Sequence, residues 1–129
     1  MVLDASAAAE LLLNTPAGKR VSSRLADSAE VIHAPHLIDI EVAQVLRRHV
    51  RHGLLEDSRA VRALDRWRDL DVERYPHSPL LDRVWELRHN VSAYDAVYVA
   101  LAEALSVSLV TGDEKLARAP GLHARIELA

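Results

Sequence analysis

Short apolar segments alternate with longer amphipathic segments along this chain, and this alternation restricts its fold more than any other feature. The short segments predict strands at residues 1–3, 30–34, 71–75, 107–110 and 124–128. In the longer segments apolar residues recur at helical spacing, which predicts helices at residues 7–13, 19–28, 37–52, 57–70, 79–88, 93–105 and 114–119. Strands that alternate with helices are typical of a parallel sheet. We therefore expect an α/β fold with a parallel sheet of about five strands, flanked by helices on both faces.

Single residues predict where several helices begin. Ser6 is expected to cap the first helix, with Glu10 as its capping-box partner. Pro16 and Gly18 predict a turn before the second helix. Ser78 is expected to cap a later helix that starts with proline, because proline is tolerated at the first helical position.

The interior must be built from aliphatic side chains, because half of the residues are apolar and the chain contains no Phe. The segment 93–105 is apolar almost all round, which is typical of a helix that is buried on most sides. Ser92 precedes this segment and is expected to cap the helix.

Length and composition narrow the class of protein. The 129 residues suit one domain, residues 1–129. The absence of Cys excludes disulfides, thiolate zinc sites and cysteine nucleophiles, and it suits a reducing, cytoplasmic location. No segment is long and apolar enough for a membrane helix, and the N-terminus does not resemble a signal peptide. The net charge of −3 counts against a nucleic-acid binder, although local basic residues can still bind phosphate.

Four acidic residues are expected to meet at one edge of the sheet. Asp4 ends the first strand and Asp113 follows the strand at 107–110. Glu41 lies about one turn into the helix after the second strand, and Asp95 lies in the first turn of the buried helix. In parallel α/β sheets ligands bind beyond the carboxyl ends of the strands, where helix N-termini also point. The four acids are therefore candidates for one site.

Clustered carboxylates repel one another, and a protein normally offsets that repulsion with cations. Oxygen-rich sites prefer Mg²⁺ or Mn²⁺, and a pair of such ions can activate water and bind a scissile phosphate. The alternative for any one acid is a helix cap or a turn residue. That alternative is weaker for Asp95, because Ser92 already supplies the cap.

The chain resembles PIN domains, and among them the toxins of VapC-type toxin–antitoxin pairs. Three segments of the sequence carry the resemblance, in the order found in the family: residues 3–7 (LDASA), residues 34–42 (APHLIDIEV), and residues 92–102 (SAYDAVYVALA) followed by 109–113 (LVTGD). The third segment is the most specific, and together the segments span nearly the whole chain.

The resemblance implies a function and a set of site residues. Asp4, Glu41, Asp95 and Asp113 match the metal-binding and catalytic acids of the family, and the hydroxyl residues Ser6 and Thr111 match those beside them. It further implies Mg²⁺ or Mn²⁺ as cofactor, endonucleolytic cleavage of single-stranded RNA, a homodimer, and inhibition by a small antitoxin protein.

Basic and aromatic residues leave alternatives open. Two groups of arginines are open to two interpretations: Arg47, Arg48 and Arg51, and further along the chain Arg59, Arg62, Arg66 and Arg68. They could form a surface that contacts RNA or a partner protein. Alternatively, they could form salt bridges on a pair of solvent-exposed helices. Trp67 and Trp85 could stack on bases, but we expect core or interface anchors. Asp39 is expected to be a helix-start acid rather than a site residue.

Two other functions fit the acids less well. A phosphoryl-transfer domain of the haloacid-dehalogenase or receiver type also clusters acids on a parallel sheet. The haloacid-dehalogenase pattern requires a second Asp where this chain has Ser6, and both types require a lysine late in the sheet, where Lys115 is expected to be helical. A catalytically silent PIN-like binding module is the second alternative, and the complete acid set argues against it.

Overall fold

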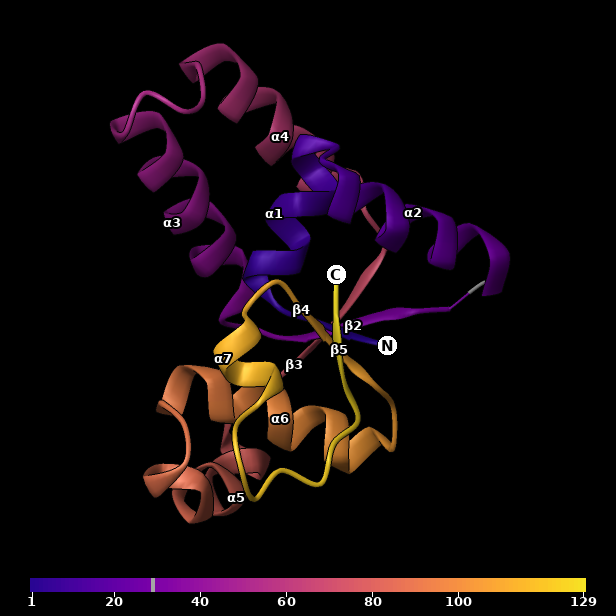
Figure 1. The fold of residues 1–129 in the computed structure, drawn as a ribbon, viewed down its shortest axis with the longest axis vertical. Coiled ribbons are helices and arrows are strands. Elements are labelled where there is room, and N and C mark those ends of the chain that lie inside the picture. The colour runs from indigo at the N-terminus through magenta and orange to yellow at the C-terminus, as the bar shows by residue number, and fades with distance from the viewer. Residues whose placement is uncertain (29) are drawn as a thin grey trace.

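The computed structural model describes residues 1–28 and 30–129. These residues form a five-stranded sheet in which every neighbouring pair of strands is parallel (Figure 1). The strand order is β3-β2-β1-β4-β5, where the strands are β1 (Val2–Leu3), β2 (Ile32–Pro35), β3 (Val72–Tyr75), β4 (Leu109–Thr111) and β5 (Ile126–Leu128). The predicted parallel α/β sheet is confirmed.

Helices cover both faces of the sheet, as predicted (Figure 1). One face carries α1 (Ala5–Leu13), α2 (Pro16–Ser28), α3 (Ile38–Arg51) and α4 (Asp57–Asp69). The other face carries α5 (Leu81–Glu86), α6 (Ala93–Leu105) and α7 (Glu114–Ala117), together with the 3₁₀ turns η1 (Ser78–Leu80) and η2 (Leu87–His89). No helix in the described part of the chain has the length and apolar character needed to cross a membrane.

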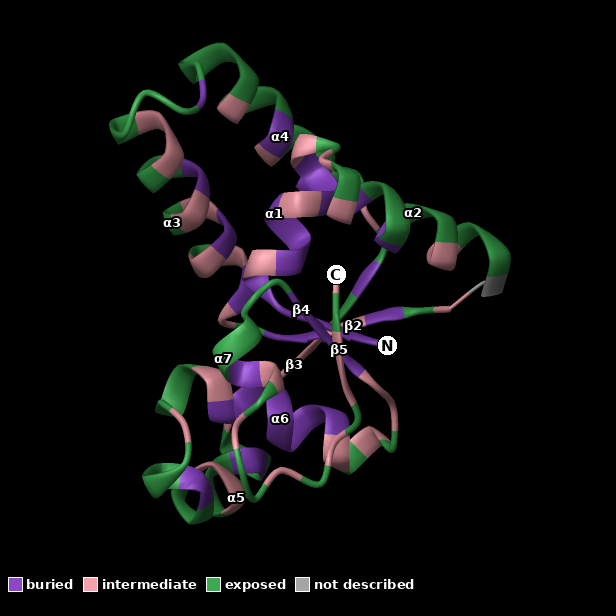
Figure 2. Ribbon diagram, viewed as in Figure 1, coloured by how far each residue is buried: buried purple, intermediate pink, exposed green. Residues whose placement is uncertain are grey.

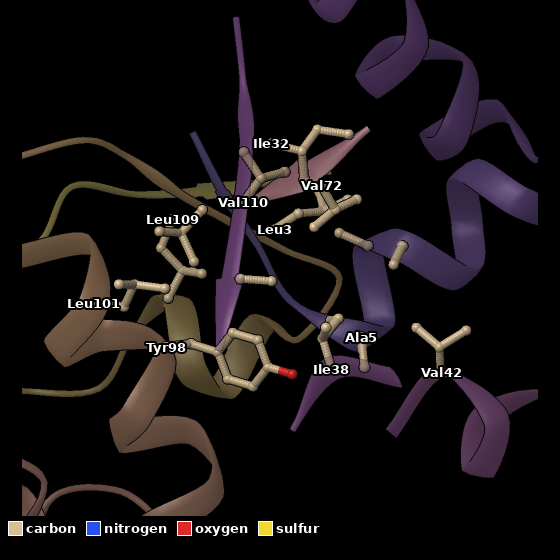
Figure 3. Close-up of a cluster of buried hydrophobic side chains, with 14 of the residues drawn as sticks. Leu3, Ala5, Ile32, Ile38, Val42, Val72, Tyr98, Leu101, Leu109 and Val110 are labelled. Atoms are coloured by element: carbon tan, nitrogen blue, oxygen red, sulfur yellow. The ribbon is translucent and has the colours of Figure 1, made fainter. Parts of the chain in front are cut away.

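The core extends over both faces of the sheet, and on one of them α6 is buried at every residue from Ala96 to Ala102 (Figure 2). This helix packs against β1, β2 and β4, and Leu101 lies beside Leu109 in the close-up view (Figure 3). Burial on all sides explains why the sequence of α6 is apolar almost all round.

The strand register places β1 and β4 side by side at their carboxyl ends. Leu3 pairs with Val110, so the residues that follow, Asp4 and Thr111, emerge together. The chain crosses one face of the sheet on going from β1 to β2, and the other face on going from β3 to β4. The carboxyl ends of the neighbouring strands β1 and β4 therefore form the topological switch point, which is where α/β sheets bind ligands.

Two local predictions at the first helix were wrong. Asp4, and not Ser6, caps α1, because the Asp4 side chain accepts a hydrogen bond from the backbone N–H of Ala7. The Glu10 side chain does not complete a capping box with Ser6, since it accepts a hydrogen bond from the hydroxyl of Thr15. These differences free the Ser6 hydroxyl for contacts across the sheet edge.

The turn predicted at Pro16 and Gly18 is the first turn of α2. Proline fits the start of a helix, and the Thr15 hydroxyl accepts a hydrogen bond from the Gly18 N–H at 3.1 Å. A Cβ atom on Gly18 would lie 1.9 Å from the carbonyl oxygen of Glu10. Glycine therefore allows α1 and α2 to pack closely at this point.

The helix predicted at residues 79–88 is divided into η1, α5 and η2, and Ser78 does not cap it. Arg83 of α5 forms ion pairs with Glu86 and with Glu103 of α6, at 2.9 and 2.7 Å. The Glu103 carboxylate also accepts a hydrogen bond from the N–H of His123 at 2.8 Å. This network attaches α5 and the segment before β5 to the buried helix α6.

Candidate active site

A cavity of about 220 Å³ lies at the carboxyl edge of the sheet, at the switch point between β1 and β4. All four predicted acids line it, although they lie far apart in the sequence. Its lining residues are Asp4, Ala5, Ser6, Glu41, Gln44, Val45, Arg48, Asp95, Tyr98 and Asp113. The structure therefore brings the predicted carboxylates to one place, which we call the acidic cavity.

Asp4 is held in one orientation by donors on both of its carboxylate oxygens. Oδ1 accepts hydrogen bonds from the Ser6 hydroxyl at 2.6 Å and from the Ala7 N–H at 2.8 Å. Oδ2 accepts a hydrogen bond from the Thr111 hydroxyl. The side chain is buried, and burial raises the pKa of Asp4 although these hydrogen bonds act in the opposite direction.

Ser6 and Thr111, the two predicted hydroxyl residues, join the ends of β1 and β4. The Ser6 hydroxyl accepts a hydrogen bond from the Gly112 N–H at 2.7 Å, and Thr111 Oγ1 accepts one from the Asp113 N–H at 2.9 Å. A Cβ atom on Gly112 would lie 3.1 Å from Ser6 Oγ, so glycine suits this close approach. The hydroxyls thus orient Asp4 and fix the loop that carries Asp113.

Glu41 reaches the acidic cavity from the first turn of α3, and the hydroxyl of Tyr98 donates a hydrogen bond to its Oε2. Burial raises the pKa of Glu41, and the negative charges of Asp95 and Asp4 raise it further, whereas the bond from Tyr98 lowers it. The carboxylates of Asp95 and Asp4 thus disfavour the charged form of Glu41.

Tyr98 was not predicted as a site residue. Its ring lies among the buried side chains of α6, and its hydroxyl points toward Ile38 and Ala5 at the carboxyl edge of the sheet (Figure 3). Burial and the neighbouring Glu41 carboxylate raise the pKa of its hydroxyl. Its spacing of three residues from Asp95 on one helix face, within the segment 92–102 that carries the family resemblance, was a signal in the sequence.

Asp95 and Asp113 enter the cavity from the N-termini of two helices. The Ser92 hydroxyl caps α6 as predicted, accepting from the Asp95 N–H at 3.1 Å, and donates to Asp95 Oδ2 at 2.8 Å. Asp113 caps α7, because its Oδ1 accepts a hydrogen bond from the Lys115 N–H at 2.7 Å. Asp4 and Asp113 therefore act as helix caps and also line the cavity.

The structure divides the basic cluster of α3. All three arginines are exposed, and of the three only Arg48 lines the acidic cavity. In the second cluster, Arg59 and Arg66 donate to the carbonyl oxygens of Leu13 and Leu12, both at 3.0 Å, at the end of α1. Those two arginines satisfy backbone acceptors at a helix C-terminus, which agrees with a structural role.

Asp39 lies outside the acidic cavity and joins three elements. Its carboxylate accepts hydrogen bonds from Arg74 of β3 and, at 2.7 Å, from the indole N–H of Trp67 of α4. The Arg74 bonds lower the pKa of Asp39, burial opposes them, and the Trp67 bond lowers it further. Trp67 is buried, as expected for a core residue, and Trp85 is exposed.

Within residues 1–28 and 30–129, no group of three or more His, Asp or Glu side chains forms a metal cage by itself. Magnesium is usually bound through one or two carboxylates, with waters and substrate phosphates completing its coordination. The acidic cavity offers only oxygen ligands from its carboxylates, and their repulsion favours a cation. The donor set thus fits a hard divalent ion that keeps part of its water.

Residues 1–122 match the family model of the PIN domain. Ribonuclease VapC1 of Mycobacterium tuberculosis is 47% identical over 128 residues, which cover 98% of this chain and 96% of the relative. Ribonuclease VapC12 of the same organism is 43% identical over 128 residues, which cover 99% of this chain and 98% of the relative.

Two crystal structures share the fold at lower sequence identity. PAE2754 from Pyrobaculum aerophilum has a TM-score of 0.69 at 24% identity, over 97% of this chain and 81% of that chain. Mycobacterium tuberculosis VapC20, described as a toxin that cleaves the sarcin-ricin loop, has a TM-score of 0.62 at 22% identity, over 94% of this chain and 95% of that chain. Together with the full-length relatives, these matches show that the chain belongs to the PIN-domain family and, within it, to the VapC ribonucleases.

Proposed function

We propose that this protein is a metal-dependent endoribonuclease that hydrolyses phosphodiester bonds in single-stranded RNA. The acidic cavity is the observation that carries the proposal, because four carboxylates from separate elements line one opening at the switch point of the sheet. We assign Asp4, Glu41, Asp95 and Asp113 as the catalytic and metal-binding acids. Ser6 and Thr111 are assigned an auxiliary role, because they orient Asp4.

The charges in the cavity support a requirement for Mg²⁺ or Mn²⁺. Burial raises the pKa values of Asp4 and Glu41, and neighbouring charges raise that of Glu41 further, so the folded protein holds these carboxylates in unfavourable surroundings. A divalent cation bound there would activate water and neutralise charge on the scissile phosphate. Asp4 needs little reorganisation to serve as a ligand, since its hydrogen bonds already fix both oxygens. Tyr98 orients Glu41 in the same way.

We further propose that the protein is the toxin of a toxin–antitoxin pair, inhibited by a small antitoxin protein. The support is the near full-length similarity to VapC ribonucleases. The acidic cavity is also open to solvent beside exposed Asp113, so a partner segment could cover it.

A homodimer is supported by an apolar surface on the α5–α6 side of the molecule. Leu81, Trp85 and Tyr94 are 56%, 69% and 64% exposed, although large apolar side chains are normally buried. They lie at or beside a mostly apolar cavity of about 330 Å³, lined by Leu37, His77, Leu81, Val84, Ala93, Tyr94 and Val97. A second copy of the chain would remove this surface from water. Light scattering of wild type and Leu81→Glu tests the dimer, and a monomeric wild type would contradict it.

The nuclease proposal is tested with purified wild type and Asp4→Asn, incubated with single-stranded RNA in manganese and in chelator. We expect cleavage only by wild type with metal. Asp39→Asn is the matched control, because Asp39 is a carboxylate outside the cavity, and it should retain metal-dependent cleavage. Wild-type rates from a folded Asp4→Asn protein would refute the assignment.

The toxin proposal needs a separate test in cells. Expression of wild type should arrest growth, Asp4→Asn should not, and co-expression of a small protein encoded beside the toxin should relieve the arrest. Unaffected growth and intact cellular RNA on expression of an active enzyme would contradict the toxin role while leaving the nuclease proposal standing.

A further inference from the structure

Arg48 is an exposed cation that lines the acidic cavity. It shares one face of α3 with Glu41, Gln44 and Val45, at helical spacings of three and four residues, and all four line the cavity. Seven residues separate Arg48 from Glu41, which is about 10 Å along the helix axis. Helical side chains lean toward the helix N-terminus, so Arg48 extends in the direction of Glu41.

The guanidinium of Arg48 has no ion pair, hydrogen bond or ring contact with any part of the chain that the structure describes. This is notable because four carboxylates line the same cavity. Other arginines of the protein are engaged, such as Arg74 with Asp39 and Arg83 with Glu103. Arg48 is therefore positioned beside the acids without neutralising any of them through direct contact.

From this geometry we propose that Arg48 binds an RNA phosphate next to the scissile one and so positions the strand across the acidic cavity. This inference rests on the proposed ribonuclease function and deepens it. RNA is a polyanion, and an opening lined by four acids repels it unless a cation offsets the field. The planar guanidinium matches phosphate bidentately. The separation of about 10 Å between their positions on the helix axis favours a phosphate next to the scissile one as the partner of Arg48.

The competing role for Arg48 is that of a counter-ion that stabilises the acids when no metal is bound. Under that role, removing the charge would lower the melting temperature in chelator, would strengthen metal binding, and would leave RNA affinity unchanged. The two roles therefore predict different changes in three measurable quantities.

The experiment compares Arg48→Gln with Arg47→Gln and Arg51→Gln, which remove the same charge from the same helix outside the cavity. Each change is made in the Asp4→Asn background so that RNA is bound and not cleaved. The affinity for a short, mixed-sequence single-stranded RNA is measured in manganese at several salt concentrations. Because this is a binding measurement, it judges Arg48 even if the wild-type protein fails to cleave RNA.

We expect Arg48→Gln to weaken RNA binding about tenfold, the loss of one charge-assisted contact, and to reduce the salt slope by about 0.7. Arg48→Lys should restore the slope but only part of the affinity, because lysine cannot bind bidentately. With Asp4 intact, the rise in melting temperature caused by manganese should be the same for Arg48→Gln as for wild type. In the active background, Arg48→Gln should raise KM much more than it lowers kcat.

The proposal is overturned if Arg48→Gln binds RNA like its parent, or if the Arg47 and Arg51 variants lose as much affinity as the Arg48 variant. The second result would assign RNA binding to the outer surface of α3 as a whole. A lower melting temperature in chelator with tighter manganese binding and unchanged RNA affinity would establish the counter-ion role instead.

Discussion

Replacing Asp95 and Asp113 together with Asn should separate a metal site from a set of structural acids. Both side chains accept hydrogen bonds at helix N-termini, from Ser92 and from the Lys115 N–H. Asn is about as good a cap as Asp, so the substitutions preserve these bonds while removing two negative charges from the cavity. Because the Asp95 charge raises the pKa of Glu41, its removal relieves repulsion in the folded protein.

The expected increase in stability on metal binding follows from the thermodynamic linkage between metal binding and folding. Metal that binds only the folded protein at a hundredfold excess over its Kd adds about 2.7 kcal/mol of stability. For a domain of this size, 1 kcal/mol shifts the melting temperature by roughly 4 °C, so wild type should gain about 10 °C in manganese. The double variant should melt at or above the wild-type temperature in chelator, and it should lose most of the gain.

The assay is thermal melting in chelator and in excess manganese, followed by circular dichroism. Asp39→Asn is the control, since it weakens the contacts of Asp39 with Arg74 and Trp67 outside the cavity. This variant should melt lower than wild type in both buffers and keep the full response to metal. The reasoning is refuted if the double variant behaves like this control, because Asp95 and Asp113 would then stabilise the fold without binding metal.

Three further predictions concern single side chains. Glu41→Gln removes a carboxyl whose pKa is raised in the folded protein, and such a group destabilises the folded state once it ionises. In chelator, the melting temperature of the variant should therefore rise relative to that of wild type as the pH increases from about 4.3 to above the folded pKa. A difference in melting temperature that does not change with pH would contradict this. Tyr98→Phe keeps the ring but removes the hydroxyl that donates a hydrogen bond to Glu41. In steady-state cleavage assays kcat/KM for RNA should therefore fall about tenfold, while the circular dichroism spectrum stays unchanged. Full activity of the variant would show that Glu41 does not need this hydrogen bond. Gly18→Ala should destabilise the protein by about 1–3 kcal/mol in urea titrations, because its Cβ would meet the Glu10 carbonyl; wild-type stability would mean that α1 and α2 can separate freely.

Much of the fold was predictable because its signals are local. The alternation of strand and helix segments identified the parallel sheet, and the apolar sequence of residues 93–105 identified the buried helix. Ser92 was correctly predicted as a cap, since a cap and its acceptor lie within one turn. At Ser6 the neighbouring Asp4 takes the role of cap, at Pro16 the predicted turn is the first turn of α2, and at Ser78 no side chain caps the 3₁₀ turn.

The positions of Asp4, Glu41, Asp95 and Asp113 at strand and helix ends predicted one acidic edge, because the carboxyl ends of parallel strands share an edge. Their roles as ligands rest on the family resemblance and stay predictions. Sequence analysis could not distinguish Arg47, Arg48 and Arg51, because the direction in which each side chain leaves the helix depends on how the helix is rotated against its neighbours.

By itself, therefore, the sequence determined the class of fold and the residues that end each strand, since propensity and periodicity act over a few residues. Only the tertiary structure decided which side chains meet across long stretches of sequence. It brought Ser6 to the Gly112 N–H and Tyr98 to Glu41, and it placed Arg48, but not Arg47 or Arg51, in the lining of the cavity. Such contacts depend on strand register and helix rotation, because a side chain turned to another face of its element meets different partners.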